Sequence, residues 1–445
     1  MITRLLKTAA FSIFLLAILT SAFASAAEDE WIPLHNDVDL QGWLPLGLGR
    51  WSSRDQNLVG YGGTQLTPSS WLVTERSWSD FDLEVSYLAA DGVESGIVLR
   101  MPPPSTAEAK ERLYKTSGPL DPGLGYEIKV RNDAKVLEPT GSIAGRQRAY
   151  AEEYTREHRP YWRPSEWNHF QISARFDHLR VKLNGRVVAD FFDRTSLAGA
   201  IALRLPPKGE VRFRKLLLRP VAISPEDAAN RKSAPTFEEG LLAAPGAFRR
   251  LFDGKSLDGW EPLWGGTWAV EEGAISGRWT LPEPEKTSGK KPHGWLLTRE
   301  EFADFVLKLK FRITEGGNSG ICIRHPAARR EGDPAFEGYE IQIEDTRRAE
   351  AWDPSGSVYA AARAFPGLAR SGEWNEMTIY ASGPRIAVHL NGKKAADFLD
   401  TERTDPRDAS RMSAGPRSAK GLLGIQIHDK EKKIEVKEVE VKPIR

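Results

Sequence analysis

Gly-Tyr-Glu-Ile at residues 125–128 returns as Gly-Tyr-Glu-Ile at residues 338–341. Five further motifs recur in the same order: Leu40-Gln41-Gly42-Trp43 with Leu257-Asp258-Gly259-Trp260, Ser79-Asp80-Phe81 with Ala303-Asp304-Phe305, Ser95-Gly96-Ile97 with Ser319-Gly320-Ile321, Glu166-Trp167-Asn168 with Glu373-Trp374-Asn375, and Leu183-Asn184-Gly185 with Leu390-Asn391-Gly392. The copies lie 207 to 224 residues apart, far beyond the roughly 20–50 residue period of solenoids and propellers. The sequence therefore predicts a duplicated domain. The halves share fold residues but need not share a site, so differences between them point to function.

Within each half the apolar residues recur with a period of two. Phe81, Leu83, Val85 and Tyr87 alternate with polar residues, as do Phe305, Leu307, Leu309 and Phe311, which is typical of half-buried strands. Asn-Gly at 184–185 and 391–392 stands between two such runs and predicts tight hairpins. No long helical pattern interrupts the alternation. Many short strands with glycine-rich turns favour an all-β fold, a sandwich or barrel with two sheets per domain.

The first residues resemble a secretory signal peptide. Arg4 and Lys7 precede an apolar stretch from Ala9 to Phe23, and small residues end near Ala26; this order predicts cleavage and a location in the periplasm or outside the cell. An uncleaved membrane anchor is the alternative, but the apolar stretch is short for a bilayer span of about 20 residues. We therefore expect residues 1–26 to be a signal peptide.

The composition excludes several classes of protein. The chain of 445 residues has a net charge of +1, and without Arg4 and Lys7 this becomes −1, so no basic excess points to nucleic acid or anionic lipid. No later apolar run reaches membrane length, which predicts a soluble mature protein. Cys322 is the only cysteine, so no disulfide forms within the chain. The hydrophobic core of each domain must therefore be large enough to stabilise that domain without a disulfide.

The boundary between the halves lies where the strand pattern lapses. Residues 224–235 read Ser-Pro-Glu-Asp-Ala-Ala-Asn-Arg-Lys-Ser-Ala-Pro, a polar, proline-containing composition that suits a linker. We predict a first domain at 31–222, a linker at 223–246 and a second domain at 247–445. The alternative is a long surface loop within one domain. The return of the domain pattern at Leu251-Phe252-Asp253-Gly254 disfavours it.

Strand parity sorts the polar side chains of the second half by face. It places Glu340, Gln342 and Glu344 together, likewise Asn318, Cys322 and Arg324, and likewise Gln426 and His428. If the three strands share a sheet, this face suits a polyol. Ordinary solvent-facing strands alternate in the same way without any function.

The first half changes this polar set. Glu127, Lys129 and Arg131 stand for Glu340, Gln342 and Glu344, and Glu94 stands for Asn318. Arg100 still matches Arg324, whereas residues 200–205 offer no clear partner for Gln426 or His428. We therefore expect any chemistry in the second half.

Aromatic and reactive residues add weaker hypotheses. Trp264, Trp279, Trp295 and Trp352 fall in loop-like stretches and are candidates for stacking on sugar rings, whereas Trp43, Trp260, Trp167 and Trp374 recur in both halves and suit core packing. Cys322 reads as a buried structural thiol. No phosphate loop, nucleophile elbow or His-x-x-x-His pair occurs.

At these residues the chain resembles the 3-keto-disaccharide hydrolase domain family, of the concanavalin-like lectin and glucanase group. The matching pieces in the second half are Leu251-Phe252-Asp253-Gly254-Lys255 with Gly259-Trp260, Asn318-Ser319-Gly320-Ile321 with Arg324, Gly338-Tyr339-Glu340-Ile341-Gln342-Ile343 with Asp345, Gly356-Ser357-Val358-Tyr359, Glu373-Trp374-Asn375 and Leu390-Asn391-Gly392. The first half resembles the family more loosely.

The resemblance implies two tandem concanavalin-like jelly-roll β-sandwiches acting on glycosides already oxidised at carbon 3. A 3-ketone acidifies the neighbouring C2–H, so a base can form an enolate that expels the C1 substituent. By this resemblance Arg324 and Asn318 suit the enolate oxygen, and Glu340 or His428 suits the base or acid, in an order the sequence leaves open. Gln342, Glu344, Asp345, Tyr359 and Gln426 are the expected substrate contacts.

Several alternatives stay open. No cofactor is expected, and the need for a divalent metal, the choice between hydrolysis and elimination, the glycoside and the oligomeric state are not determined. The rival function is a non-catalytic module of the cell envelope that binds glycan or protein, because a fold does not fix a function.

Overall fold

The structure, a computed structural model, describes residues 30–47, 49–62, 70–90, 92–102, 124–133, 136–150, 159–206, 208–279, 293–329, 337–345, 353–400, 419–428 and 432–444. The predicted signal peptide and Trp352 lie outside these residues. In the described part of the chain, no helix has the length and apolar character needed to cross a membrane.

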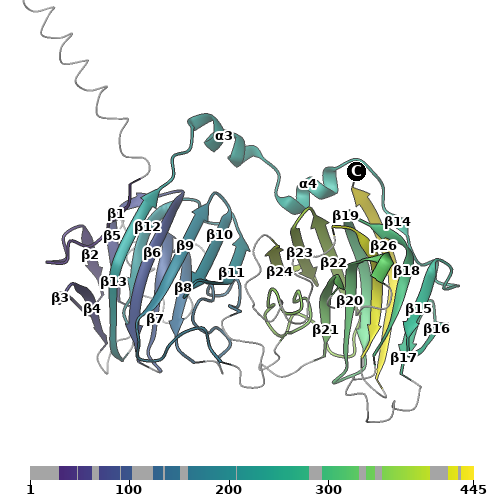
Figure 1. Cartoon of the computed structure of the whole chain (residues 1–445). Helices are drawn as coiled ribbons and strands as arrows, with labels where there is room; N and C mark the ends of the chain where they lie inside the picture. Colours follow the sequence, from purple (N-terminus) through teal and green to yellow (C-terminus); the bar gives the residue numbers. More distant parts are fainter. Residues whose placement is uncertain are drawn as a thin grey trace, which may run out of the picture.

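Strands make up most of both halves (Figure 1). Those of the first half are β1 (Ile32–Pro33), β2 (Trp43–Leu46), β3 (Arg50–Arg54), β4 (Asn57–Gly62), β5 (Trp71–Trp78), β6 (Phe81–Ala89), β7 (Glu94–Met101), β8 (Tyr126–Arg131), β9 (Asn168–Arg175), β10 (His178–Leu183), β11 (Arg186–Phe192), β12 (Gly199–Arg204) and β13 (Gly209–Pro220). Those of the second half are β14 (Arg249–Arg250), β15 (Trp260–Trp264), β16 (Thr267–Glu271), β17 (Ala274–Arg278), β18 (Gly294–Phe302), β19 (Asp304–Ile313), β20 (Asn318–His325), β21 (Tyr339–Glu344), β22 (Asn375–Ser382), β23 (Arg385–Leu390), β24 (Lys393–Leu399), β25 (Gly421–Ile427) and β26 (Lys433–Ile444).

Each half is a β-sandwich of two antiparallel sheets. The first pairs β11-β10-β9-β6-β13-β4-β3, with β1 beside β13, against β2-β5-β12-β7-β8. The second repeats this order strand for strand, with β24-β23-β22-β19-β26-β17-β16 and β14 against β15-β18-β25-β20-β21. The all-β class and the two tandem sandwiches predicted from the sequence are confirmed.

Side-chain alternation builds each core. Phe305, Leu307, Leu309 and Phe311 of β19 are buried between the two sheets of the second domain, and β6 does the same in the first domain. The Asn-Gly pairs form two-residue turns with positive φ at both positions, 50° and 83° at 184–185 and 50° and 77° at 391–392, as hairpins of this type require. The predicted hairpins are confirmed.

The recurring tryptophans divide into two groups. Trp43 and Trp260 are buried, and each donates its indole N–H to a backbone carbonyl nine residues earlier, Leu34 and Leu251. Trp167 and Trp374 are half-buried and lie under cations, Arg214 over the first and Lys437 over the second. The core role predicted for all four is therefore wrong for Trp167 and Trp374.

Two short helices fold the segment between the sandwiches. In α3 (Pro225–Ser233) the Ser224 hydroxyl accepts the N–H of Asp227, and proline occupies the first turn, where its missing N–H costs nothing. In α4 (Phe237–Ala243) Thr236 and Glu239 form a capping box. The polar and proline residues that read as a linker are thus helix-capping signals.

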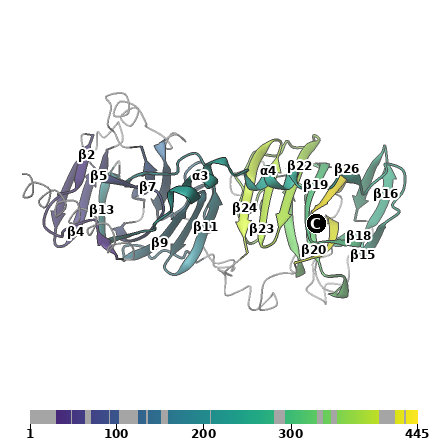
Figure 2. The same ribbon diagram turned by 90° about the horizontal axis from the view of Figure 1, so that it is seen from above.

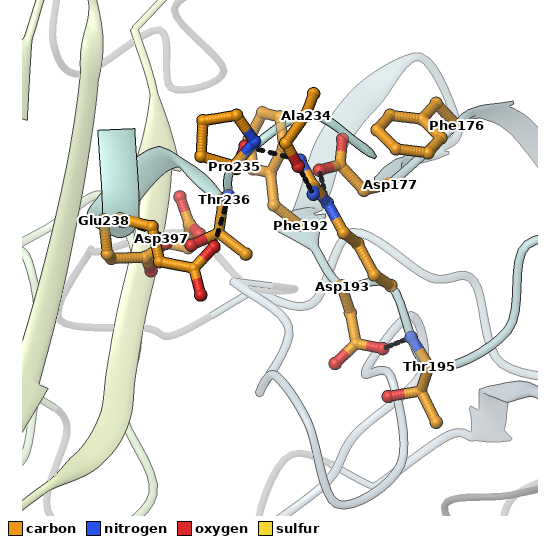
Figure 3. Close-up of polar contacts among 12 residues, drawn as sticks. Phe176, Asp177, Phe192, Asp193, Thr195, Ala234, Pro235, Thr236, Glu238 and Asp397 are labelled. Carbon is orange, nitrogen blue, oxygen red and sulfur yellow. Dashed lines mark hydrogen bonds and ion pairs between the residues drawn. The ribbon is translucent and has the colours of Figure 1, made fainter. Parts of the chain in front are cut away.

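The linker is anchored to both domains. Arg194, just after β11, donates to Asp177 of its own domain at 3.0 Å and to the carbonyls of Ala234 and Pro235 at 2.6 and 3.0 Å (Figure 3). On the other side, Leu241 of α4 packs against the second domain. The turn between the helices is therefore held at the junction.

Equivalent parts of the two halves meet each other. The edge strands β11 and β24 are in contact (Figures 1 and 2). Arg148 forms an antiparallel bridge with Arg363, which occupies the same place in the second half, since the bridges Ile128 to Ile143 and Ile341 to Val358 precede them equivalently. Contact between like surfaces is the pattern of a two-fold interface, so the duplicated chain imitates a homodimer.

Proteolysis separates the roles of the two helices. α3 buries no residue and carries Arg231 and Lys232 in its last turn, so trypsin should cut there. A glutamate-specific protease should cut α4 more slowly, because Leu241 anchors it. After the tryptic cut the halves should still elute together in gel filtration, since the β11 and β24 contact does not need the linker. Fragments that separate would contradict this interface.

The Glu238 carboxylate gives the linker a pH dependence. Burial would raise its pKa, but hydrogen bonds from His389 at 3.2 Å and Lys394 at 2.9 Å outweigh this and hold the pKa well below its usual range. A depressed pKa stabilises the fold above the unfolded value of about 4.3, and this contribution is lost as the pH falls. Glu238→Gln should therefore lower the melting temperature at pH 7, with the difference shrinking below about pH 4. A difference that is constant with pH would contradict the assignment.

Candidate functional site

The candidate site lies on the outer face of the sheet β15-β18-β25-β20-β21 in the second domain. Opposed residues of paired strands share a face, and the register fixes three rows across this sheet. The carboxylate row is Leu297, Gly424, Cys322 and Glu340. The glutamine row is Trp295, Gln426, Gly320 and Gln342. The histidine row is His293, His428, Asn318 and Glu344, where the first two rings stack with centroids 6.2 Å apart.

Glu340 leans from its own row into the glutamine row. A Cβ built on Gly320 would overlap the Glu340 carboxylate, so the absent side chain of glycine is what makes room for it. Glu340, Gln342 and Gln426 are each at least 96% buried. Leu297 and Cys322 close the other side as part of an apolar cluster. The carboxylate therefore lies between an apolar wall and a row of amides.

The amides are only partly satisfied by the protein. Gln342 donates to the Asn318 side chain at 3.2 Å, whereas the buried Oε1 of Gln426 has no hydrogen-bond partner among the described residues. Buried acceptors without a partner are rare in folded proteins and indicate a water or a ligand. Gln426 thus offers an unused acceptor on the floor of this face.

The same positions in the first domain form a closed network of charges. The register pairs Arg204 with Gly96 and Gly96 with Lys129, so Arg204 and Lys129 stand where Gln426 and Gln342 stand in the second domain. Arg204 and Lys129 contact Glu127, the counterpart of Glu340, at 3.0 and 3.1 Å, and Arg204 also contacts Glu94 at 3.1 Å. Burial would lower the pKa of Arg204, but Glu127 and Glu94 outweigh it and raise the pKa.

This corrects one sequence-based expectation. Residues 200–205 were expected to hold no partner for Gln426, but Arg204 is that partner. In both domains the residue's backbone carbonyl accepts the hydroxyl of the motif serine, Ser95 for Arg204 at 2.6 Å and Ser319 for Gln426 at 2.7 Å. The second domain replaces two cations around a buried carboxylate with two amides.

Arg324 does not belong to the polar face, and its predicted place beside Glu340 is wrong. A β-bulge shifts the register between Cys322 and His325, and Arg324 has a φ of 56°, which ends the alternation that parity assumes. Its guanidinium is buried and donates to the carbonyls of Ala303 and Gly383 at 2.9 and 2.7 Å and to Asp304 at 3.1 Å. These partners border strands of the opposite sheet.

Arg100 makes the same kind of bond in the first domain. Its φ is 54°, and it donates to the Ser79 carbonyl at 2.9 Å and lies 3.4 Å from Asp80. Burial lowers the pKa of both guanidinium groups, and Asp80 and Asp304 oppose the shift. Arg324 and Arg100 are therefore structural ties between the two sheets of each sandwich.

The bulge brings a different residue to the site. His325 pairs with Leu422, two residues from Gly424 on β25, so it shares the face of Cys322 and Glu340, and it is fully buried. Its counterpart in the first domain is Met101, opposite Ala200. The parity argument missed His325 because strict alternation assigns residue 325 to the core. A comparison of Met101 with His325 across the halves was the available signal.

The remaining predicted site residues lie at different places relative to the Glu340 carboxylate. Continuing the register of β25 places half-buried His428 in the histidine row, one row beyond the Glu340 carboxylate, and rows lie about 6.7 Å apart. Glu344 stands at the end of that row. Tyr359 is half-buried and donates its backbone N–H to the Glu340 carbonyl at 2.8 Å. Asp345 binds the Gly316 N–H and the Ser371 hydroxyl at 2.7 and 2.8 Å, so its described bonds hold a loop.

The tryptophans predicted to stack on sugar rings differ in their burial. Trp295 lies in β18, not in a loop, is fully buried in the glutamine row opposite Gln426, and occupies the position of Trp71 in the first domain. Trp279 is half-buried against Gly265. Trp264 is 47% exposed. Cys322 is buried and free, as expected for a structural thiol.

No metal site is evident in the described part of the chain, where no three His, Cys, Asp or Glu side chains group to hold an ion. A cleft of about 550 Å³ lies on the outer face of the eight-stranded sheet of the second domain, between Lys308, Lys310, Glu376 and Glu438. Lys310 already pairs with both glutamates there. This cleft is on the opposite side of the sandwich from Glu340.

The chain was compared with known protein families and with curated protein sequences. The sequence pattern of one family, the 3-keto-alpha-glucoside-1,2-lyase-like domain, matches residues 30–219 and again residues 247–442. No curated protein sequence matches the chain.

Solved structures also resemble it. A candidate glycosyl hydrolase from Parabacteroides distasonis is 21% identical, with 50% of this chain and 99% of that chain covered and a TM-score of 0.35. A second one from the same organism is 24% identical, with 42% and 99% covered and a TM-score of 0.31. The carbohydrate-binding module CBM66 from Bacillus subtilis is 18% identical, with 40% and 95% covered and a TM-score of 0.29.

The two buried arginines give a matched test of structure against function. Changing either arginine to glutamine leaves two or more buried acceptors without a donor. Each unsatisfied acceptor costs about 1–3 kcal/mol of folding free energy. Arg324→Gln and Arg100→Gln should therefore both destabilise their own domain by at least about 2 kcal/mol in urea unfolding. A stable Arg324→Gln protein that has lost only activity would restore Arg324 to the site.

Proposed function

The chain belongs to the family of 3-keto-alpha-glucoside-1,2-lyase-like domains in both halves, and we propose from this that its second domain cleaves glycosides oxidised at carbon 3. The family description makes the function carbohydrate-related. The observation that supports catalysis in the second domain is the exchange of Arg204 and Lys129 for Gln426 and Gln342 around a buried carboxylate. This exchange puts amides at the two positions from which cations contact Glu127 in the first domain.

The proposed reaction is an elimination. The C3 ketone acidifies C2–H, and a base removes that proton to give an enolate. The enolate then re-forms the ketone as the C1–O bond breaks, which leaves a carbon–carbon double bond between C1 and C2. The departing oxygen takes a proton from an acid, so a glycoside yields one unsaturated keto sugar and one alcohol. Addition of water to the double bond would turn this lyase reaction into net hydrolysis.

The residues divide these roles by position. Glu340 is proposed as the base because its carboxylate lies on the floor of the face, beside Gln426 and Gln342. The amide groups of Gln342 and Asn318 replace Arg324 as donors to the enolate oxygen, since oriented donors stabilise such charge. His428 lies one row away and is proposed as the acid for the leaving oxygen. His325 is proposed to border the base on its other side.

Export is part of the proposal. The basic residues Arg4 and Lys7 followed by an apolar stretch support a signal peptide and a periplasmic or secreted protein. The substrate would then be made by a separate oxidoreductase that converts the C3 hydroxyl of a glycoside to a ketone.

The base is tested with a matched pair of variants. Glu340→Gln keeps the shape of the side chain and removes its titrating group, so turnover of a 3-keto-α-glucoside should fall about 10²–10⁴-fold, as for loss of a general acid or base. Glu127→Gln in the same full-length chain should retain turnover per folded molecule. Unchanged turnover in Glu340→Gln, or loss only in Glu127→Gln, would reject the assignment.

The charge exchange is tested by transplanting the first domain's network. Gln342→Lys with Gln426→Arg introduces the two cations that contact Glu127 in the first domain, and should abolish turnover by neutralising Glu340. Full activity in this double variant would overturn the argument. Wild-type protein that binds a 3-keto-glucoside without releasing product would favour a binding module in place of an enzyme.

A further inference from the structure

Trp264 occupies a backbone conformation that suits glycine. Its φ is 66°, in the left-handed region, where a bulky residue is a genuine outlier. The equivalent residue of the first domain, directly after β2, is Gly47 with a φ of 100°. Glycine adopts this region without penalty, so the second domain retains a strained tryptophan where an unstrained residue serves the same turn.

The strained residue presents its ring to solvent. Trp264 is 47% exposed, the one exposed tryptophan among the described large apolar residues. The turn behind it is tightly packed, since a Cβ on Gly265 would overlap the Trp279 ring and a Cβ on Gly294 would overlap the Gly265 carbonyl. Strain that persists in a rigid setting is typical of functional positions.

The ring of Trp264 adjoins the histidine row. Its centroid lies 5.2 Å from that of His293, edge to face, and His293 stacks on His428 with an interplanar angle of 4°. Trp264, His293 and His428 thus form a strip of flat side chains, the aromatic strip, one row beyond the glutamine row. The first domain has no such strip, because Gly47 and Pro206 stand at the positions of Trp264 and His428.

We propose that the aromatic strip is a subsite for a second sugar ring, the leaving group of an α-linked 3-keto-disaccharide. This rests on the proposed function, which puts the oxidised ring over the glutamine row beside Glu340. The C1 substituent then extends toward His428, the proposed acid, and onto Trp264. An aromatic plate matches the apolar C–H face of a sugar, and the imidazoles supply polar contacts at its rim.

The test compares two substrates of different length on the full chain. Relative to wild type, Trp264→Gly should lower the ratio of kcat/KM for 3-keto-maltose to kcat/KM for methyl 3-keto-α-glucoside by about 10-fold or more. Trp264→Phe should restore part of this ratio, because it keeps a flat ring. Trp264→Gly should melt at or above the wild-type temperature, since it relieves the strained φ. Tyr61→Ala, an exposed aromatic of the first domain, is the control and should leave the ratio unchanged.

Failure of the subsite and failure of the proposed reaction give different results. An unchanged ratio in a folded Trp264→Gly protein would overturn the subsite while leaving the proposed reaction intact. If wild type turns over neither compound, the proposed reaction fails, and calorimetry with 3-keto-maltose then decides the subsite. Equal affinity of wild type and Trp264→Gly would overturn it, and weaker binding by Trp264→Gly alone would support it.

Discussion

The buried guanidinium of Arg324 ties the five-stranded sheet of the second domain to its partner sheet, and the composition of the outer face depends on that tie. To reach the carbonyls of Ala303 and Gly383, the strand must turn Arg324 inward at a positive φ. The resulting bulge carries His325 to the outer face, beside Cys322 and Glu340. A bulge that re-aims side chains next to a functional face is a recurrent device, and Arg100 uses it identically in the first domain.

The duplication acts as an internal control on this face. Residues that recur, such as the serines that bind the β12 and β25 carbonyls and the glycines under Glu127 and Glu340, build the frame in both halves. Residues that differ decide charge. In the first domain the carboxylate of Glu127 contacts both Arg204 and Lys129, and a buried ion pair is expensive to break, whereas the second domain has neutral amides at both positions. The same backbone thus supports a closed ionic network in one domain and a polar site in the other.

The two sandwiches also support each other. The edge strands β11 and β24 cover one another, and an uncovered edge would otherwise invite pairing with another chain. Arg385 packs over both Phe192 of the first domain and Phe237 of α4. Its guanidinium carbon lies 3.4 and 4.4 Å from the two ring centroids. The first domain therefore has a structural reason to persist beside the second even where its own polar face is closed by ion pairs.

The sequence by itself determined the duplication, the all-β class, the hairpins at Asn184-Gly185 and Asn391-Gly392, and the outward direction of Glu340 and Gln342, because these follow from local periodicity and turn chemistry. It failed where one residue changes the phase of a strand. A bulge is stabilised by partners distant in sequence, Ala303 and Gly383 for Arg324, so parity misassigned Arg324 and missed His325. Only the register between β25 and β20 paired Gln426 with the position of Arg204, since strand pairing is set by tertiary packing. The strain at Trp264 was likewise invisible in the sequence, because a backbone angle is fixed by the surrounding turn rather than by the residue itself.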